Sequence, residues 1–137
     1  MIKSESRSAA VTSQPRTSAF ILVVDDDPGI VGFLGLALVD EGYRVRSAAN
    51  GRLALEQVTQ NQPDLILLDM NMPVMDGWEF CQELRSRGGP YPSIPIVVMT
   101  AARDAATRAR EVSAQGYLGK PFDLEQLFEM VNSLLHQ

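Results

Sequence analysis

The chain has 137 residues, of which 45% are hydrophobic and 21% are charged, and its formal net charge at pH 7 is −5. This length allows one domain with a substantial core but is too short for two full domains. No apolar run approaches the length of a membrane span, and the acidic balance argues against a nucleic-acid surface, which needs clustered Lys and Arg. We therefore expect one soluble domain with neither a membrane nor a nucleic-acid partner.

The first 19 residues differ in composition from the rest of the chain. They contain five Ser and two Thr and lack the apolar segment of a secretion signal. We expect residues 1–19 to be a disordered tail and residues 20–137 to form the folded domain. Without a targeting signal, the expected location is the cytoplasm.

Apolar runs alternate with amphipathic stretches through the rest of the chain. Three of the runs are continuous, which is typical of strands buried on both faces of a parallel sheet. The amphipathic stretches are bounded by Asp, Gly and Pro, as helices commonly are. The expected strands are 20–24, 43–48, 64–69, 94–99 and 116–119, and the expected helices cover 30–41, 53–58, 78–87, 104–114 and 124–134.

Acidic residues mark the starts of three expected helices. Asp27, directly before Pro28, is expected to cap the first helix rather than to bind a metal. Asp76 is expected to form a turn and a helix start, and Asp123 to cap the last helix. On the first helix, we expect Phe33 to face the core.

The stretch 104–114 is the weakest of the expected helices. Val112 is its only large apolar residue, so we expect it to pack shallowly and to be able to move. Arg108 and Arg110 in this stretch, together with Arg103 just before it, are expected to form a solvated helix face. A partner-binding role for them is the less favoured alternative.

Two residues of the 78–87 helix are assigned to packing. Cys81 is the only cysteine, which excludes an internal disulfide, and it falls on the apolar face of the helix. We expect it to be a core residue and not a nucleophile. Trp78 is expected to be a partly exposed aromatic residue near the functional edge of the sheet.

Five strand–helix repeats predict right-handed crossovers and a three-layer α/β fold, in which helices cover both faces of a doubly wound parallel sheet. The carboxyl ends of all strands then meet at one edge of the sheet, where such folds bind their ligands. Polar residues stand at these strand ends, although they are far apart in the chain. The residues expected to converge are Asp25, Asp26, Asp69, Thr100 and Lys120.

These side chains have a chemistry in common. Three carboxylates close together repel one another, and a divalent cation removes the repulsion. Oxygen ligands without His or Cys suit Mg²⁺ or Mn²⁺, which leave positions open for phosphate oxygens. Asp69 could attack a phosphoryl group to form an acyl phosphate, while Lys120 neutralises a phosphoryl oxygen and Thr100 donates a hydrogen bond. The expected chemistry is phosphoryl transfer.

Five short motifs occur in order, each at or after the end of an expected strand. They are Val24-Asp25-Asp26-Asp27, Leu68-Asp69, Met72-Pro73 with Asp76-Gly77, Met99-Thr100-Ala101, and Gly116-Tyr117-Leu118-Gly119-Lys120-Pro121-Phe122. Together they resemble the receiver domain of two-component response regulators, of the CheY-like kind, over about residues 20–135. The resemblance implies a flavodoxin-like strand order, 2-1-3-4-5.

The resemblance also implies a phosphorylation site with a metal beside it. Asp69 is the expected phosphoacceptor, and Lys120 the expected partner of the phosphoryl group. The expected ligands of Mg²⁺ (or Mn²⁺) are Asp26, Asp69 and the main-chain carbonyl of Asn71, while Asp25 is expected to hold a metal-bound water.

Three further features are implied by the same resemblance. Thr100 is the expected hydroxyl that moves toward the phosphoryl group, and Tyr117 the aromatic residue that turns inward behind it. The Lys120–Pro121 peptide bond is expected to be cis. Ser113 stands where the family commonly has glycine, in a segment about two residues shorter than usual, so this region is the least predictable.

The function implied is that of a stand-alone receiver. It would accept a phosphoryl group from a sensor histidine kinase or a histidine phosphotransfer protein and would signal to an unidentified protein target. It would catalyse only its own phosphorylation and dephosphorylation, so we do not expect an enzyme. The last strand and the helices on either side of it form the family's usual output face.

Three alternatives stay open at this stage. The chain could be a scaffold that binds partners without phosphorylation, or a receiver cut from a larger protein. It could also be a Mg²⁺-dependent phosphatase that uses an aspartyl phosphate. The phosphatase is disfavoured because Asn71 stands where a second acid would be needed as general acid and base, and because no cap insertion encloses a substrate.

Overall fold

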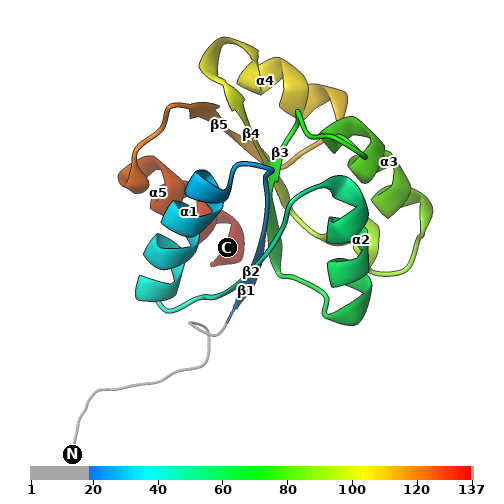
Figure 1. Ribbon diagram of the computed structural model, residues 1–137, viewed down its shortest axis with the longest axis horizontal. Coiled ribbons are helices and arrows are strands. Elements are labelled where there is room, and N and C mark those ends of the chain that lie inside the picture. Colours follow the sequence, from blue (N-terminus) through cyan, green and yellow to red (C-terminus); the bar gives the residue numbers. More distant parts are fainter. Residues whose placement is uncertain (1–18, 137) are drawn as a thin grey trace, which may run out of the picture.

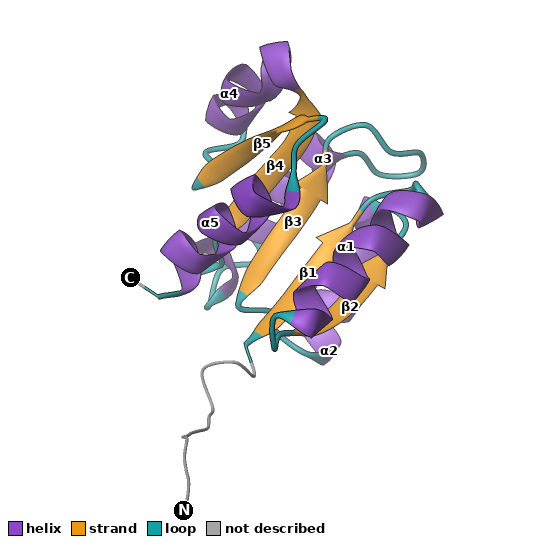
Figure 2. Cartoon of the chain, turned by 90° about the vertical axis from the view of Figure 1, so that its left-hand side faces the viewer, coloured by secondary structure: helices purple, strands orange, loops and turns teal. Residues whose placement is uncertain are grey.

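The computed structural model describes residues 19–136, which form five strands and five α-helices around one sheet (Figure 1, Figure 2). The predicted disordered tail lies outside the described residues, apart from Ala19, whose carbonyl accepts a hydrogen bond from the Arg44 N–H at 3.0 Å. The strands are β1 (Phe20–Val24), β2 (Arg44–Ala48), β3 (Leu65–Asp69), β4 (Ile96–Ala101) and β5 (Gly116–Lys120). The helices are α1 (Pro28–Asp40), α2 (Gly51–Gln60), α3 (Gly77–Ser86), α4 (Ala102–Glu111) and α5 (Leu124–Leu135), with a short 3-10 turn at Tyr91–Ser93.

All neighbouring strands pair in parallel, in the order β2-β1-β3-β4-β5. Helices α1 and α5 cover one face of the sheet, and α2 and α3 cover the other (Figure 1). The flavodoxin-like three-layer α/β fold expected from the sequence is therefore confirmed. Among residues 19–136, no helix has the length and apolarity needed to cross a membrane.

The core consists of two apolar layers, one on each side of the sheet. Successive strand residues point to opposite faces, so Leu22 and Val24 belong to the layer under α2 and α3, whereas Ile21 and Val23 belong to the layer under α1 and α5. The central strands β1, β3 and β4 are buried on both faces, which explains their continuous apolar runs. Cys81 is 2% exposed within the first layer, as expected for a core residue.

The predicted helix caps are present. The side chain of Asp27 accepts hydrogen bonds from the N–H groups of Gly29 and Ile30 at 2.9 and 3.4 Å. Asp76 and Asp123 both form capping boxes, in which the third residue of the helix bonds back to the cap. These acids satisfy N–H groups that would otherwise have no partner in the helix.

The region around α4 corrects two predicted boundaries. Strand β4 extends to Ala101, so Thr100 lies inside the strand and not after it. Helix α4 begins at Ala102, two residues before the predicted start at Asp104, and no loop separates it from the strand. Ser113 adopts a φ of 55°, in the left-handed region, which is the conformation that makes glycine common at such a position. The Lys120–Pro121 peptide bond is cis, as predicted.

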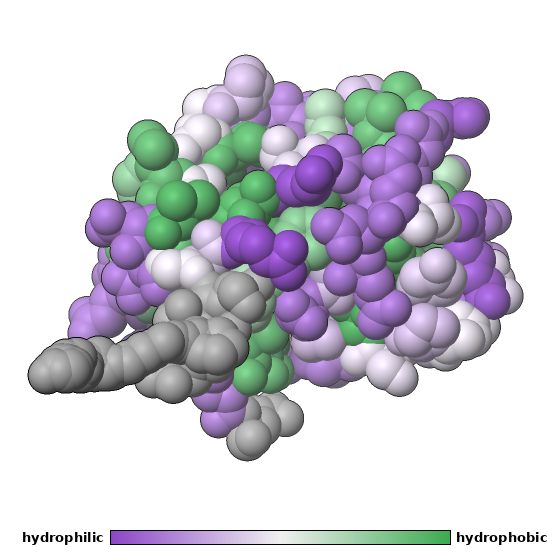
Figure 3. Space-filling model, turned by 90° about the horizontal axis from the view of Figure 1, so that it is seen from below, coloured by the Kyte–Doolittle hydropathy of each residue, from purple (hydrophilic) through white to green (hydrophobic). Residues whose placement is uncertain are grey.

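The outer surface of α1 is apolar, contrary to the expectation that Phe33 faces the core. Only Leu34 and Leu38 of this helix are buried. Phe33, Leu36 and Val39 are 55%, 77% and 57% exposed. A view from below shows apolar atoms gathered on the side where α1 and α5 lie in Figure 1 (Figure 3). Because α1 is apolar all round, its sequence pattern could not distinguish the buried stripe from the exposed one.

Candidate functional site

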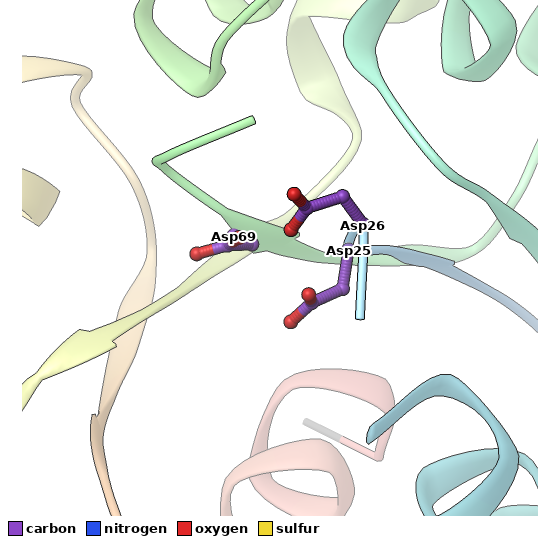
Figure 4. Close-up of side chains that lie close together, drawn as sticks. All are labelled: Asp25, Asp26 and Asp69. Atoms are coloured by element: carbon purple, nitrogen blue, oxygen red, sulfur yellow. The ribbon is translucent and has the colours of Figure 1, made fainter. Parts of the chain in front are cut away.

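Three carboxylates meet at the carboxyl edge of the sheet. Asp25 and Asp26 directly follow β1, and Asp69 is the last residue of β3. The two strands pair with Val24 opposite Leu68, so the register brings Asp25 next to Asp69. Oxygen atoms from the three side chains lie within 4.8 Å of one another. Figure 4 shows the three carboxylates gathered at this edge.

Asp25 is held in place on both of its oxygens. The residue is 2% exposed, and its Oδ1 accepts a hydrogen bond from the Asp27 N–H at 2.9 Å. Its Oδ2 lies 3.1 Å from Nζ of Lys120, the last residue of β5. The Asp25 N–H donates to the carbonyl of Ala48, at the end of β2. Asp25 is therefore a fixed, paired charge at the centre of the edge.

Asp69 is buried like Asp25, but its polar contacts are longer. It is 6% exposed, and its Oδ1 lies 3.6 Å from Lys120 Nζ and 3.5 Å from the Asn71 N–H. Burial, and then the neighbouring Asp25 carboxylate, raise the pKa of Asp69 above its usual value, although Lys120 acts in the opposite direction. Asp26 is exposed to solvent. The cluster thus carries more negative charge than Lys120 alone can neutralise.

The donor set fits a hard divalent cation. Asp25, Asp26 and Asp69 offer only oxygen atoms, close enough together for one ion. A cation among them would offset the repulsion that raises the pKa of Asp69. The main chain of Asn71 is anchored to Asp69 through its N–H, while the predicted use of its carbonyl as a ligand stays a prediction.

Thr100 lies on β4, next to the strand that carries Asp69, and Tyr117 lies on β5, the edge strand beyond it. Met99 pairs with Asp69 across β3 and β4, so Thr100 is the next residue toward the edge, and it is 6% exposed. Tyr117 of β5 pairs with Val98 of β4, and 47% of the tyrosine's surface is exposed. The structure thus brings Asp25, Asp26, Asp69 and Lys120 together, with Thr100 at the same edge, while Tyr117 lies on β5 three residues before Lys120 and so further from this edge.

Gly77 has a packing role that the sequence analysis did not assign. Its N–H donates to the Met70 carbonyl at 3.0 Å. A Cβ atom at this position would stand 2.6 Å from Met70 Sδ, 2.8 Å from Met70 Cα and 3.1 Å from the Asp69 carbonyl oxygen. Only a glycine lets α3 begin this close to the chain that follows Asp69. The Asp-Gly turn therefore supports the site, although it takes no part in its chemistry.

Arg108 was expected on a solvated face, but it contacts α3. Its Nη1 lies 2.6 Å from Glu111 Oε1, and its guanidinium carbon lies 5.6 Å from the ring centroid of Trp78. Trp78 itself is half-buried and donates a hydrogen bond to Glu111 at 2.9 Å. No local sequence pattern indicates this contact, because Trp78 and Glu111 are 33 positions apart.

Comparisons with known proteins agree with this geometry. Residues 21–132 match the family model described as "Response regulator receiver domain". The response regulator MprA of Mycolicibacterium vanbaalenii is 40% identical over 119 residues, which are 85% of this chain and 50% of that protein. The chain thus spans about half the length of the curated relatives it matches.

Two solved structures have the same architecture at higher coverage. The chemotaxis response regulator CheY4 of Vibrio cholerae is 36% identical with a TM-score of 0.78, and the match covers 85% of this chain and 98% of that one. The signal receiver domain of a signal transduction histidine kinase from Syntrophus aciditrophicus is 32% identical with a TM-score of 0.78, covering 86% and 90%. The matched proteins therefore differ in what accompanies the shared domain.

Proposed function

Because the chain belongs to the response regulator receiver domain family, we propose that Asp69 accepts a phosphoryl group from a phosphohistidine protein and that this modification switches a partner-binding face. The observation that carries the proposal is the environment of Asp69. It is a buried carboxylate beside a second acid, Asp25, and the cation Lys120. Such a group is oriented for attack, and Lys120 offsets its negative charge only in part, because burial and Asp25 still raise its pKa.

The proposed reaction moves one phosphoryl group. A carboxylate oxygen of Asp69 forms a bond to phosphorus as the bond from phosphorus to the histidine nitrogen breaks, and that nitrogen keeps the electron pair. The product is an acyl phosphate. Lys120 orients and neutralises a phosphoryl oxygen, and Thr100 donates its hydroxyl hydrogen to another. The donor would be a sensor histidine kinase or a histidine phosphotransfer protein.

We propose that Asp25, Asp26, Asp69 and the Asn71 carbonyl hold Mg²⁺ or Mn²⁺ during this transfer, with Asp25 acting through a bound water. The ion supplies positive charge for the transferring phosphoryl oxygens. The protein residues fix the carboxylate and exclude water from the buried side of Asp69. The chain would turn over only its own phosphoryl group, so it is proposed to be a signalling module and not an enzyme acting on an external substrate.

The proposed switch couples Asp69 to the surface through Thr100 and Tyr117. When Thr100 moves toward the phosphoryl group, it leaves space at the end of β4 into which the exposed Tyr117 ring can turn. Shifting an equilibrium from 1:99 to 99:1 takes about 5.5 kcal/mol, more than one hydrogen bond provides. Metal, Lys120, Thr100 and the downstream partner would therefore act together.

The context of the domain is also a proposal. We propose that residues 20–137 act as a stand-alone receiver in the cytoplasm, with a protein as the downstream target and no direct nucleic-acid contact. The net charge of −5 supports the absence of nucleic-acid contact for this chain. The match covers only 50% of MprA, so the alternative is that the same domain functions as one part of a longer protein.

The test is the intact mass of the chain after incubation with acetyl phosphate. We expect one phosphoryl adduct with Mg²⁺, none when a chelator removes the metal, and none on the Asp69→Asn variant. Absence of an adduct in every condition would favour the phosphorylation-independent scaffold. Sustained release of phosphate from phosphate esters would favour the phosphatase instead.

A further inference from the structure

Helix α4 is attached to the domain with little apolar burial. Of its residues, only Ala105 and Ala109 are buried, together with Val112 at its C-terminal cap. Small side chains contribute little hydrophobic stabilisation, because that contribution grows with the apolar area removed from water. Something else must hold this helix in position.

Three side chains connect the start of α3 with the end of α4. The Trp78 indole N–H donates to Glu111 Oε1 at 2.9 Å, and Arg108 Nη1 lies 2.6 Å from the same oxygen. The Arg108 guanidinium stacks over the Trp78 ring at 5.6 Å, a cation–π distance. Each residue therefore contacts the other two. We call Trp78, Arg108 and Glu111 the latch.

A second side chain of α3 holds the same end of α4. Arg85 donates from Nη1 to the Val112 carbonyl and from Nη2 to the Ser113 carbonyl at 3.2 Å. Carbonyls at a helix C-terminus lack partners within the helix, so these bonds are favourable. The N-terminal cap, Ala101, makes no side-chain hydrogen bond. Polar contacts with α3 therefore fix the C-terminal end of α4.

The two helices that the latch joins are each connected along the chain to a part of the phosphorylation site. Trp78 follows Gly77, which packs against Met70 just after Asp69. At the other end, α4 begins at Ala102 directly after β4, so no loop can absorb a movement of Thr100. A displacement of the Thr100 main chain toward Asp69 would therefore also displace the start of α4.

We propose that the latch stabilises the position that α4 takes in the unphosphorylated chain, and that it thereby positions Thr100. When Asp69 is phosphorylated, the latch opens. This inference rests on the proposed function. A contact present in only one of two conformations stabilises that conformation, so removing the latch shifts the equilibrium toward the other. For one exposed ionic contact the shift is about two- to fivefold.

The first test compares rates of phosphorylation by acetyl phosphate in Mg²⁺. Trp78→Phe keeps an aromatic ring under Arg108 but removes the N–H donor, and Arg108→Ala removes both contacts of the arginine. Arg110→Ala is the matched control, because it removes the same charge from α4 while its hydrogen bond is to Thr107 of the same helix, at 3.3 Å. We expect Trp78→Phe and Arg108→Ala to be phosphorylated about two- to fivefold faster than the control.

A purely structural role would not accelerate phosphorylation, since a loosened helix would leave the rate unchanged or lower it. Equal or slower rates in Trp78→Phe and Arg108→Ala therefore overturn the latch, while the adduct on the native chain still supports the proposed function. Amide hydrogen exchange of residues 102–112 in the unmodified chain gives an independent measurement. We expect faster exchange in both latch variants than in Arg110→Ala, and equal exchange would overturn the latch even if no variant were phosphorylated.

Discussion

Nζ of Lys120 lies 3.1 Å from Oδ2 of Asp25, although the two residues are 95 positions apart in the chain. The pair links the ends of β1 and β5, which are not neighbours in the sheet. Strands β3 and β4 lie between them, and Lys120 Nζ is also 3.6 Å from the carboxylate of Asp69, at the end of β3. One cation therefore serves two acids before any phosphoryl group arrives.

Replacing Lys120 with Gln should slow phosphorylation of Asp69 by roughly 10²-fold, because a half-buried positive charge beside the transferring group is lost. Lys120→Arg keeps the charge but not the shape, so we expect an intermediate rate. The measurement is the rate of adduct formation with acetyl phosphate at saturating Mg²⁺. A native rate in Lys120→Gln would show that Lys120 is only a partner of Asp25.

The raised pKa of Asp69 makes stability depend on pH in a definite direction. Burial and the Asp25 carboxylate raise this pKa, so the folded, metal-free chain binds the proton more tightly than the unfolded chain does. Folding stability should therefore fall as the pH rises from the usual Asp pKa through the raised one. Above that range Asp69 is ionised and its full destabilising effect is present.

Asp69→Asn should remove this part of the pH dependence. In the presence of a chelator, we expect the variant to unfold at a higher temperature than the native chain at pH 7, and to lose most of that advantage near pH 4. A gain of about 1 kcal/mol would raise the midpoint by roughly 3–6 °C. If the two unfolding temperatures differed by the same amount at both pH values, the charge of Asp69 would not destabilise the folded chain.

Two adjacent acids allow a matched test of the metal site. Mg²⁺ binding should stabilise the native fold by about 2.7 kcal/mol when the free ion is at 100 times its Kd, and so raise the thermal midpoint. Asp26→Asn should weaken Mg²⁺ binding and make this rise smaller. Asp27→Asn removes the same charge one residue later, but Asn can still cap α1. We expect this control to keep the native response. Equal losses in both variants would indicate general charge screening instead of a site.

Residues whose role follows from chain order could be predicted from the sequence. Apolar runs identified the central strands, and parallel strands bring their carboxyl ends to one edge, so the meeting of Asp25, Asp26, Asp69 and Lys120 followed from the topology alone. The cap at Asp27 followed from its place before Pro28. These features depend on local chemistry or on the order of the elements.

Features that depend on packing could not be predicted in the same way. The start of α4 was misplaced because Ala101 makes no side-chain cap and so leaves no signal in the sequence. Phe33 was assigned to the core because α1 is apolar on every side. The contacts of Arg108 with Trp78 join residues on different helices, and an exposed arginine has the same local pattern whether or not such a partner exists.

The close approach of α3 to the chain after Asp69 can be tested at Gly77. An alanine Cβ would stand 2.8 Å from the Met70 Cα, so Met70 or the start of α3 would have to move. We expect Gly77→Ala to lower the free energy of unfolding by roughly 1–3 kcal/mol. Phosphorylation should also slow, because the main chain beside Asp69 shifts.

Gly35→Ala provides the matched control for this substitution. Gly35 is also helical, but nothing lies within 4 Å of the position that its Cβ would take. Alanine there should increase stability by about 0.5–1 kcal/mol, since it restricts the unfolded chain and favours the helix. Urea unfolding of both variants gives the comparison. The contrary result is a Gly77→Ala variant that is as stable as Gly35→Ala and is phosphorylated at the native rate. That result would mean that the loop after Asp69 moves without loss of stability, and that the contact between Gly77 and Met70 does not position the phosphoacceptor.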